Sequence, residues 1–408
     1  MERLEKLFEL SGPDMEKIVE SFILEMERGL AGEKSSLKMI PTYVRMPTGK
    51  EKGKFIAIDL GGTTFRVLEL TLKGDRKIGR TGIMKFVLEK KYVTGSAELF
   101  FDFIADNVNI FLRKYKLTDT STLDLGFTFS FPIRQTGIAS GTLICWTKDF
   151  NISGVTGNDV VKLMREAFRR RGIKNIDIAA LVNDTVGTLA AKSYEEPDCD
   201  LGVIIGTGTN ACYPEKSRGR MVINIEWGNF NKLASTPYDR QLDEESDNPG
   251  QQMLEKMVSG MYLGRIAGLV LKVEGFKTEH MSAIEGDMTD DLRVTGRLLG
   301  RLGIVKSSLK ERRMFKKVCG IVSCRAARIS ASCIAAIIRR MDPHLSGTHT
   351  VAVDGSVFEK HPTFSQNMEN ALKEIFSRKA SRIRLALTKD GSGKGAAIIA
   401  AVAGKYEK

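Results

Sequence analysis

Apolar and polar residues follow one another along the chain with periods that predict an α/β protein. Between residues 55 and 182, short apolar runs with the character of strands are separated by segments with helical spacing. The first three strands follow one another closely, which indicates a meander of neighbouring strands. In order, the predicted elements are the strands FIAIDL, FRVLELTL and GIMKFVLE, the helix SAELFFDFIADNVNIFLRKY, the strand LDLGFTFSFP, a helix over 159–171 and the strand IDIAALVND.

The pattern starts again at Leu201. LGVIIGTGTNACY predicts a strand, a Gly/Thr loop and more extended chain, and RMVINIEWG predicts a strand that pairs with it. Helical spacing dominates from 248 to 341, and the C-terminal part predicts two further strands, a glycine-rich turn and a closing helix. Because each half begins with a hairpin that carries a Gly/Thr loop, we expect two lobes of duplicated architecture.

Two segments near the N-terminus are less regular. The first 30 residues have helical spacing that breaks near Gly12–Pro13, so they predict one interrupted helix or two helices. RMPTGKEKGK, residues 45–54, is rich in Gly, Pro and Lys, and we expect it to be a flexible connector.

The composition is that of a globular protein with more than one core. A chain of 408 residues is expected to form two or three domains. Its net charge of +12 could attract polyanions, but the densest basic stretches, 306–317 and 378–384, lack the interleaved aromatic residues that single-stranded nucleic acid needs. We therefore do not expect nucleic-acid binding.

The six cysteines and the N-terminus point to a reducing compartment. The cysteines are scattered without a C-x-x-C pair, so we expect reduced thiols packed as small core residues rather than a metal site. The N-terminus lacks the apolar core of a secretory signal, and no apolar run approaches the length of about 18 residues that a membrane span requires. The expected protein is soluble and cytoplasmic.

Two Gly/Thr hairpins are candidate phosphate cradles. DLGGTT at 59–64 and GTGTN at 206–210 could present backbone N–H groups and hydroxyls to a polyphosphate from opposite sides. Asp59 could in addition hold Mg²⁺ through water, because cations bound to phosphates usually take one or two carboxylates from the protein. The alternative for each loop is an ordinary turn.

Two other phosphate motifs fit the sequence less well. GTGTNA, from Gly206, formally matches a dinucleotide fingerprint with Glu226 about 20 residues further on. That fingerprint must open a helix, whereas Pro214 and Gly219 here mark a turn into the next strand. GSGK at 391–394 lacks the spacing of a P-loop.

Asp184 is the candidate general base. It lies in ALVNDTVGTLAA, where a predicted strand ends and a helix begins, so it could either cap the helix or take a proton from a substrate hydroxyl. Asn183 beside it favours the second role, because an amide and an acid can bracket one hydroxyl. Further amides, acids and hydroxyls suit a neutral polyol, and Lys148 supplies a cation for a phosphoryl group. These residues are Ser130, Thr147, Lys148, Asn183, Asn210, Glu226 and Glu255.

A series of ordered motifs resembles the eukaryotic-type hexokinase and glucokinase family, a sugar kinase branch of the actin-like ATPase superfamily. The series extends from about Leu37 almost to the C-terminus. Its members are FIAIDLGGTTFRVL, LGFTFSFPI, WTKDF, LVNDTVGTLAA, IIGTGTNACY, INIEWGNF, NPGQQMLEKMVSGMYLG and VAVDGSVFEKHPTF.

The resemblance implies a fold, an activity and a set of site residues. It implies two lobes, each with a mixed five-stranded sheet flanked by helices, with hexose and MgATP in a cleft that closes on the sugar. The large lobe would comprise 1–45 and 184–390, and the small lobe 46–183 and 391–408. By family match, Asp184 is the base and the polar set named above surrounds the hexose. The nucleotide residues would be Asp59, Gly61, Gly62, Thr63, Thr207, Gly208, Gly355, Ser356 and Ser308.

Some residues depart from the family pattern, and two other functions stay open. Asp149 stands where Gly is usual, Arg265 replaces a usual Glu, and the connection after Tyr213 is short, so sugar preference and regulation do not follow from the resemblance. The alternatives are a sugar or sugar-amine kinase of another actin-like branch and a sugar sensor that has lost catalysis. The sequence does not give the oligomeric state.

Overall fold

The computed structural model describes residues 1–118, 120–146 and 150–404. The chain forms two compact units. Unit 1 comprises Met1–Met39, Val203–Ala211 and Ile225–Leu387, and unit 2 comprises Ile40–Gly202, Cys212–Asn224 and Thr388–Lys408. Four segments that we expected in the large lobe belong to unit 2, namely 40–45, 184–202, 212–224 and 388–390.

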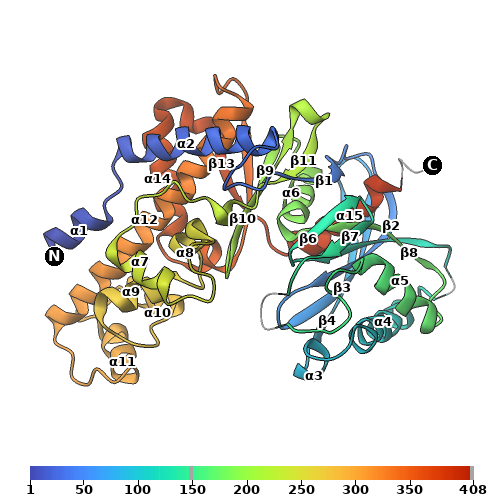
Figure 1. Ribbon diagram of the computed structural model, residues 1–408, viewed down its shortest axis with the longest axis horizontal. Coiled ribbons are helices and arrows are strands. Elements are labelled where there is room, and N and C mark those ends of the chain that lie inside the picture. The colour runs from blue at the N-terminus through green and yellow to red at the C-terminus, as the bar shows by residue number, and fades with distance from the viewer. Residues whose placement is uncertain (119, 147–149, 405–408) are drawn as a thin grey trace. The chain divides into compact units, whose positions relative to one another are not determined.

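Unit 2 contains a mixed five-stranded sheet with the order β4-β3-β2-β5-β8 (Figure 1). Strands β2, β3 and β4 form the antiparallel meander that the sequence predicts, whereas β2, β5 and β8 run parallel. The bounds are β2 Lys52–Leu60, β3 Thr64–Lys73, β4 Ile78–Val87, β5 Leu123–Phe129 and β8 Ile176–Val182. A separate hairpin consists of β6 (Ile133–Gly137) and β7 (Ser140–Leu143).

Helices complete the core of unit 2. Helix α4 (Ala97–Lys114) is capped by Ser96, whose side chain accepts a hydrogen bond from the Leu99 N–H, and it packs against α5 (Val160–Arg170). Both helices have an apolar face, which explains why they were predictable from sequence. The remaining helices of this unit are α3 (Lys90–Val93), α6 (Asp184–Glu195), the 3₁₀ turn Lys216–Arg218 and α15 (Gly391–Ala403).

Glycines allow α15 to lie unusually close to α6. A Cβ added to Gly395 would lie 1.8 Å from the Gly187 carbonyl oxygen, and one added to Gly187 would lie 2.6 Å from the Ser392 carbonyl oxygen. Any larger residue would force the helices apart. The GSGKG segment therefore serves helix packing in this fold.

The second sheet has six strands in the order β1-β11-β10-β9-β12-β13. Their bounds are β1 Ile40–Arg45, β9 Cys199–Ile205, β10 Thr209–Glu215, β11 Met221–Asn224, β12 His349–Asp354 and β13 Ile383–Leu387. The sixth strand is β1, which the sequence analysis did not anticipate and which pairs antiparallel with β11. The division between the units passes through β9 and β10, so each of these strands contributes residues to both.

The segment 45–54 is ordered, so its expected flexibility was wrong. Residues 52–54 already belong to β2. Glu51 is only 1% exposed, and its carboxylate accepts hydrogen bonds from the Thr48 and Gly49 N–H groups at 3.1 and 2.9 Å. A buried carboxylate with these partners holds the turn in one conformation.

Unit 1 is mainly helical. The N-terminal segment forms two helices, α1 (Glu2–Phe8) and α2 (Gly12–Leu30), with a capping box at Ser11. The long helix α12 (Leu309–Met341) packs against α2 and α14 (Phe364–Phe376). The other helices are α7 Pro237–Glu244, α8 Met253–Val258, α9 Leu263–Leu271, α10 Thr278–Glu285, α11 Arg293–Arg301, α13 Ser356–Lys360 and the 3₁₀ turns Trp227–Asn229 and Ser377–Arg382.

Two expectations from composition need correction. Helix α12 has the length and hydropathy of a membrane span, contrary to our expectation, although 83% of its most apolar window is buried, and a buried core helix meets the same criterion. Four of the six cysteines are buried as expected, but Cys145 is exposed and Cys324 is only half-buried.

Candidate active site

The three parallel strands of unit 2 bring candidate site residues to one edge of the sheet. Asp59 of β2 is in register with Thr128 of β5, which in turn is in register with Val182 of β8. Ser130 follows the end of β5, and Asn183 with Asp184 follows the end of β8. Because the carboxyl ends of parallel strands meet at one edge, Ser130, Asp184 and Asp59 share it, and ligands of α/β proteins bind at such edges.

Asp59 is a buried carboxylate with a cationic partner. It is 7% exposed, and its Oδ2 atom accepts hydrogen bonds from Arg66 Nε at 3.0 Å and from Ser392 Oγ at 2.9 Å. Arg66 also pairs with Asp390. Burial disfavours the charge on Arg66, but the two carboxylates outweigh this effect and raise its pKa. The Asp59 carboxylate is therefore held in position beside a permanent cation.

The surroundings of Asp59 fit a magnesium ion held through water. Within the described residues, the hydrogen bonds of its carboxylate all fall on Oδ2, which leaves Oδ1 for water or a cation. In the described parts of the chain, no three carboxylate, His or Cys side chains are grouped as a metal site. A cation here would take most of its ligands from phosphate and water, as Mg²⁺ commonly does.

Asp184 is the first residue of α6, and Asn183 is its N-cap. The Asn183 side chain accepts a hydrogen bond from the Thr185 N–H at 3.0 Å, so the capping role considered for Asp184 belongs to its neighbour. Asp184 Oδ1 accepts from the Thr185 N–H at 2.8 Å and from Thr185 Oγ1 at 3.2 Å. These bonds orient the carboxylate, and no contact is recorded for its Oδ2 atom among the described residues.

The second Gly/Thr loop lies in unit 1, between β9 and β10. The Gly206 carbonyl accepts a hydrogen bond from the Gly260 N–H at 2.7 Å, and the Thr207 carbonyl accepts one from the Met261 N–H at 3.1 Å. Gly355 lies against the same loop, because a Cβ added to it would lie 2.4 Å from the Ile205 carbonyl carbon. The loop is thus clamped by backbone on two sides while Thr207 stays exposed.

Hydrogen bonds connect three candidate hexose residues, Asn210, Glu226 and Glu255, to this loop. Asn210 Nδ2 donates to Glu226 Oε1 at 3.1 Å, and Glu255 Oε2 accepts from the Thr209 N–H at 3.0 Å. Glu226 has a backbone φ of 54°, a left-handed conformation that is uncommon for this residue type and often marks functional sites. The strain is consistent with a carboxylate that must point in one direction.

Thr209 links the members of this group. Its Oγ1 accepts a hydrogen bond from Trp227 Nε1 at 2.8 Å and donates to the Ile204 carbonyl at 2.8 Å. Thr209 is 7% exposed and Trp227 is fully buried. Since Trp227 follows Glu226 directly, one threonine connects both carboxylates to the strand that carries the loop.

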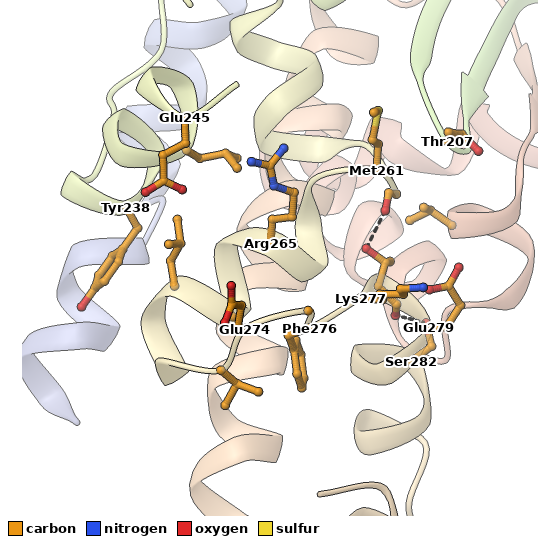
Figure 2. A pocket seen from close by; sticks show the side chains of 18 of the residues that line it. Thr207, Tyr238, Glu245, Met261, Arg265, Glu274, Phe276, Lys277, Glu279 and Ser282 are labelled. Atoms are coloured by element: carbon orange, nitrogen blue, oxygen red, sulfur yellow. Dashed lines mark hydrogen bonds between the residues drawn. The ribbon is translucent and has the colours of Figure 1, made fainter. Parts of the chain in front are cut away.

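A cavity of about 1200 Å³ in unit 1 extends from the loop (Figure 2). Its lining residues include Thr207, Ser356, Thr278 and Ser282. In Figure 2, Thr207 and Ser282 lie on one side, and Arg265 of α9 lies toward Glu245 on the other. Ligand pockets are usually about 300–1,000 Å³, so there is room for a nucleotide. The cavity favours the nucleotide role proposed for Thr207 and Ser356.

Arg265, which replaces a glutamate in the family pattern, lies beside the ring of Tyr262. The guanidinium carbon is 5.7 Å from the ring centre. Burial and the charge of Glu255 raise the pKa of the Tyr262 hydroxyl, and Arg265 acts in the opposite direction. Arg265, which stands in place of the usual glutamate, therefore acts electrostatically on the Tyr262 hydroxyl, as Glu255 also does.

Several expected residues remain without a tested role. Thr147 and Lys148, like Asp149, lie outside the described residues. Ser308 is not among the residues that line the cavity; it caps α12 through hydrogen bonds with Glu311. The phosphate-loop roles of Gly61, Gly62 and Thr63 in unit 2 and of Gly208 in unit 1 remain predictions.

The sequence analysis missed three residues that hold site side chains. These are Arg66, Thr209 and Ser392, whose partners lie 7, 46 and 333 residues away in the chain. Arg66 and Thr209 stand inside the motifs FIAIDLGGTTFRVL and GTGTN, which was the available signal. For Ser392 the sequence offers no such signal, because its partner lies 333 residues away.

Comparison with known proteins decides the family. Family models described as Hexokinase match residues 1–194 and 200–402. The chain belongs to the hexokinase family. Hexokinase HKDC1 of Homo sapiens is 41% identical over 448 residues, which cover 100% of this chain and 48% of the human protein. Hexokinase-1 of Spinacia oleracea is 41% identical over 443 residues, covering 96% of this chain and 88% of the spinach protein.

A solved hexokinase also shares the structure. The hexokinase from Schistosoma mansoni complexed with glucose is 36% identical, with a TM-score of 0.86 over 98% of this chain and 97% of that one. The expected fold, two mixed α/β units of the actin-like type, is thereby confirmed. The chain spans about half the length of its human hexokinase relative and most of its plant relative. The family match also removes the alternative of another actin-like branch.

Proposed function

We propose that this hexokinase transfers the γ-phosphoryl group of MgATP to the 6-hydroxyl of glucose or a similar hexose. One observation carries the proposal. The Asp184 carboxylate is oriented through Oδ1 by Thr185 at the carboxyl edge of parallel strands, and among the described residues no side chain or backbone group forms a hydrogen bond with its Oδ2 atom. A carboxylate held in this way can accept a proton from a hydroxyl.

The proposed reaction forms a bond between the hexose 6-oxygen and the γ-phosphorus and breaks the bond between that phosphorus and ADP. Asp184 takes the proton of the attacking hydroxyl. ATP supplies the phosphoryl group, and Mg²⁺ offsets its charge. Asp59 is the residue proposed to hold the magnesium through water, and Lys148 is proposed to meet the transferring group. Most of the rate enhancement then comes from holding the hexose hydroxyl and the γ-phosphoryl group in a reactive geometry.

The hexose is proposed to contact residues from both units. Asn210, Glu226 and Glu255 come from unit 1, and Ser130 and Asn183 from unit 2. Thr147, which lies outside the described residues, is proposed to join them by family match. These amides, acids and hydroxyls match the hydroxyls of a sugar, and each unpaired buried group would cost about 1–3 kcal/mol with an analogue that lacks its partner. We propose that hexose binding completes the site and thereby limits ATP hydrolysis.

Replacing Asp184 tests the base directly. Asp184→Asn keeps the shape but cannot accept a proton, so we expect kcat to fall by about 10²–10⁴ while the hexose dissociation constant changes little. Initial rates with glucose and MgATP, combined with a binding titration, measure both. Asp177→Asn, which changes an exposed aspartate on β8, the strand that precedes Asp184, is the matched control and should keep full activity. Wild-type turnover in Asp184→Asn would remove the proposed base.

The remaining alternative is a sensor that binds hexose without catalysis. Both Gly/Thr loops and the oriented Asp184 argue against it, since a sensor needs no base. Hexose-dependent release of ADP by the pure protein separates the two functions. A panel of hexoses with and without Mg²⁺ then gives the substrate preference and the need for the cation.

A further inference from the structure

Segment 287–317 of unit 1 carries a local excess of unpaired positive charge. Six exposed cations have no hydrogen bond or ion pair recorded for their side chains in the part of the chain that the structure describes. They outnumber the exposed unpaired carboxylates of the same segment, Asp290 and Asp291, by four. The cations are Arg293, Arg297, Arg301, Lys306, Lys310 and Arg313.

Helix α11 aligns three of these cations. Arg293, Arg297 and Arg301 are spaced four residues apart, so they lie on one face of the helix. Thr295 and Leu299 are fully buried and occupy the opposite face. The arginines therefore point away from unit 1, at whose edge α11 lies (Figure 1).

The helix is held rigidly on its inner side. Asp287 Oδ2 accepts hydrogen bonds from the Thr295 N–H at 2.7 Å and from Thr295 Oγ1 at 2.8 Å, and Asp287 Oδ1 accepts from Thr289 Oγ1 at 2.6 Å. Lys316 Nζ of α12 donates to the Asp287 carbonyl at 2.6 Å. The arginine face is thus presented in one orientation, which lowers the entropy cost of binding.

Two large apolar side chains on the segments that enter and leave α11 are exposed. Met288, just before α11, is 87% exposed, and Val305, just after it, is 74% exposed. Cations beside exposed apolar side chains are typical of surfaces that lie in the interface of an anionic membrane. Nucleic acid fits less well, because the only aromatic side chain in 287–317, Phe315, is buried.

We propose that the α11 surface, formed by Arg293, Arg297, Arg301, Met288 and Val305, docks the protein on anionic phospholipid. The guanidinium groups bind the headgroup phosphates and carboxylates, and the two apolar side chains enter the layer beneath them. None of these residues is among those that line the cavity of unit 1.

Vesicle sedimentation tests the proposal. We expect the wild-type protein to bind vesicles of phosphatidylcholine with phosphatidylserine, to ignore pure phosphatidylcholine, and to be released by salt. Each basic residue near an anionic surface contributes about 1 kcal/mol, so the R293E/R297E/R301E variant should bind at least about a hundredfold more weakly. The M288S/V305S variant should also bind more weakly at unchanged charge.

A matched variant controls for net charge. R113E/K162E/K174E reverses three exposed cations of unit 2 and should bind phosphatidylserine vesicles like the wild type. Equal loss in this variant would overturn the proposal in favour of a general charge effect. Wild-type binding by M288S/V305S would instead indicate a purely electrostatic surface for an acidic partner, and would exclude lipid insertion. Phosphorylation assays on every variant report whether it is folded.

Discussion

At the scale of single residues, Thr209 forms hydrogen bonds with both Trp227 and Glu255, so a change in its side chain should affect the proposed hexose site. Removing its hydroxyl while keeping its shape, as in Thr209→Val, leaves the buried Trp227 N–H without a partner. An unsatisfied buried donor costs about 1–3 kcal/mol, and the strain falls on the segment that holds Glu226. We expect the KM for hexose to rise about tenfold or more, with a smaller effect on the KM for ATP.

Thr209→Ser is the control for this prediction. Serine keeps the hydroxyl that accepts from Trp227 and donates to Ile204, so it should restore a KM close to that of the wild type. Steady-state kinetics with each substrate varied in turn measures the separation. If valine and serine raise both KM values equally, Thr209 serves general packing and does not position the hexose residues.

At the scale of secondary structure elements, the contact between α6 and α15 determines where Asp184 lies. Gly395→Ala would place a methyl group 1.8 Å from the Gly187 carbonyl oxygen, which requires the helices to move apart. Overpacking usually costs about 1–3 kcal/mol, so we expect a lower melting temperature and a lower kcat. Gly300→Ala on α11, where nothing lies within 4 Å, is the matched control and should be neutral or slightly stabilising. A fully stable and active Gly395→Ala variant would contradict this view of the packing.

The turn before α11 depends on an ionised Asp287. Burial raises the pKa of this carboxyl, but hydrogen bonds from Thr289 and Thr295 outweigh it and bring the pKa from 3.8 to about 2. Since the folded-state pKa is depressed, the stabilisation is present above pH 4 and is lost as the pH falls toward 2. This corresponds to about 2 kcal/mol. In the Asp287→Asn variant, the free energy of unfolding should therefore no longer show this decrease between pH 4 and pH 2. Denaturant titrations at several pH values measure it, and a pH dependence equal to that of the wild type would refute the assignment.

The same scale shows what could be predicted from the sequence. The meander, α4, α5 and the hairpin around residues 206–210 were predictable because each carries its own periodicity and caps. The order of motifs assigned roles to Asp184 and Glu255 through the family resemblance, and these roles stay predictions. Strand β1 was not predicted, because its pairing with β11 is a long-range contact. The Ser392–Asp59 hydrogen bond was missed for the same reason, since local patterns do not report which distant segments meet.

At the scale of the whole molecule, the proposed function requires one hexose to engage both units. Each unit contains one tryptophan beside proposed sugar residues, Trp146 in unit 2 and Trp227 in unit 1. Trp146 Nε1 donates to the Ile152 carbonyl at 3.0 Å, and Trp227 is tied to Thr209. Glucose should thus change the emission of both rings, which the single variants Trp146→Phe and Trp227→Phe report separately.

The two variants distinguish a shared site from a local one. If hexose binds residues of both units, each variant should retain a signal from its remaining tryptophan, with the same glucose dissociation constant for both. A response that disappears entirely in one variant would restrict the hexose to the unit whose tryptophan was removed. That result would contradict the mechanism above, because Asp184 in unit 2 and Glu255 in unit 1 must meet the same sugar for phosphoryl transfer to proceed as proposed.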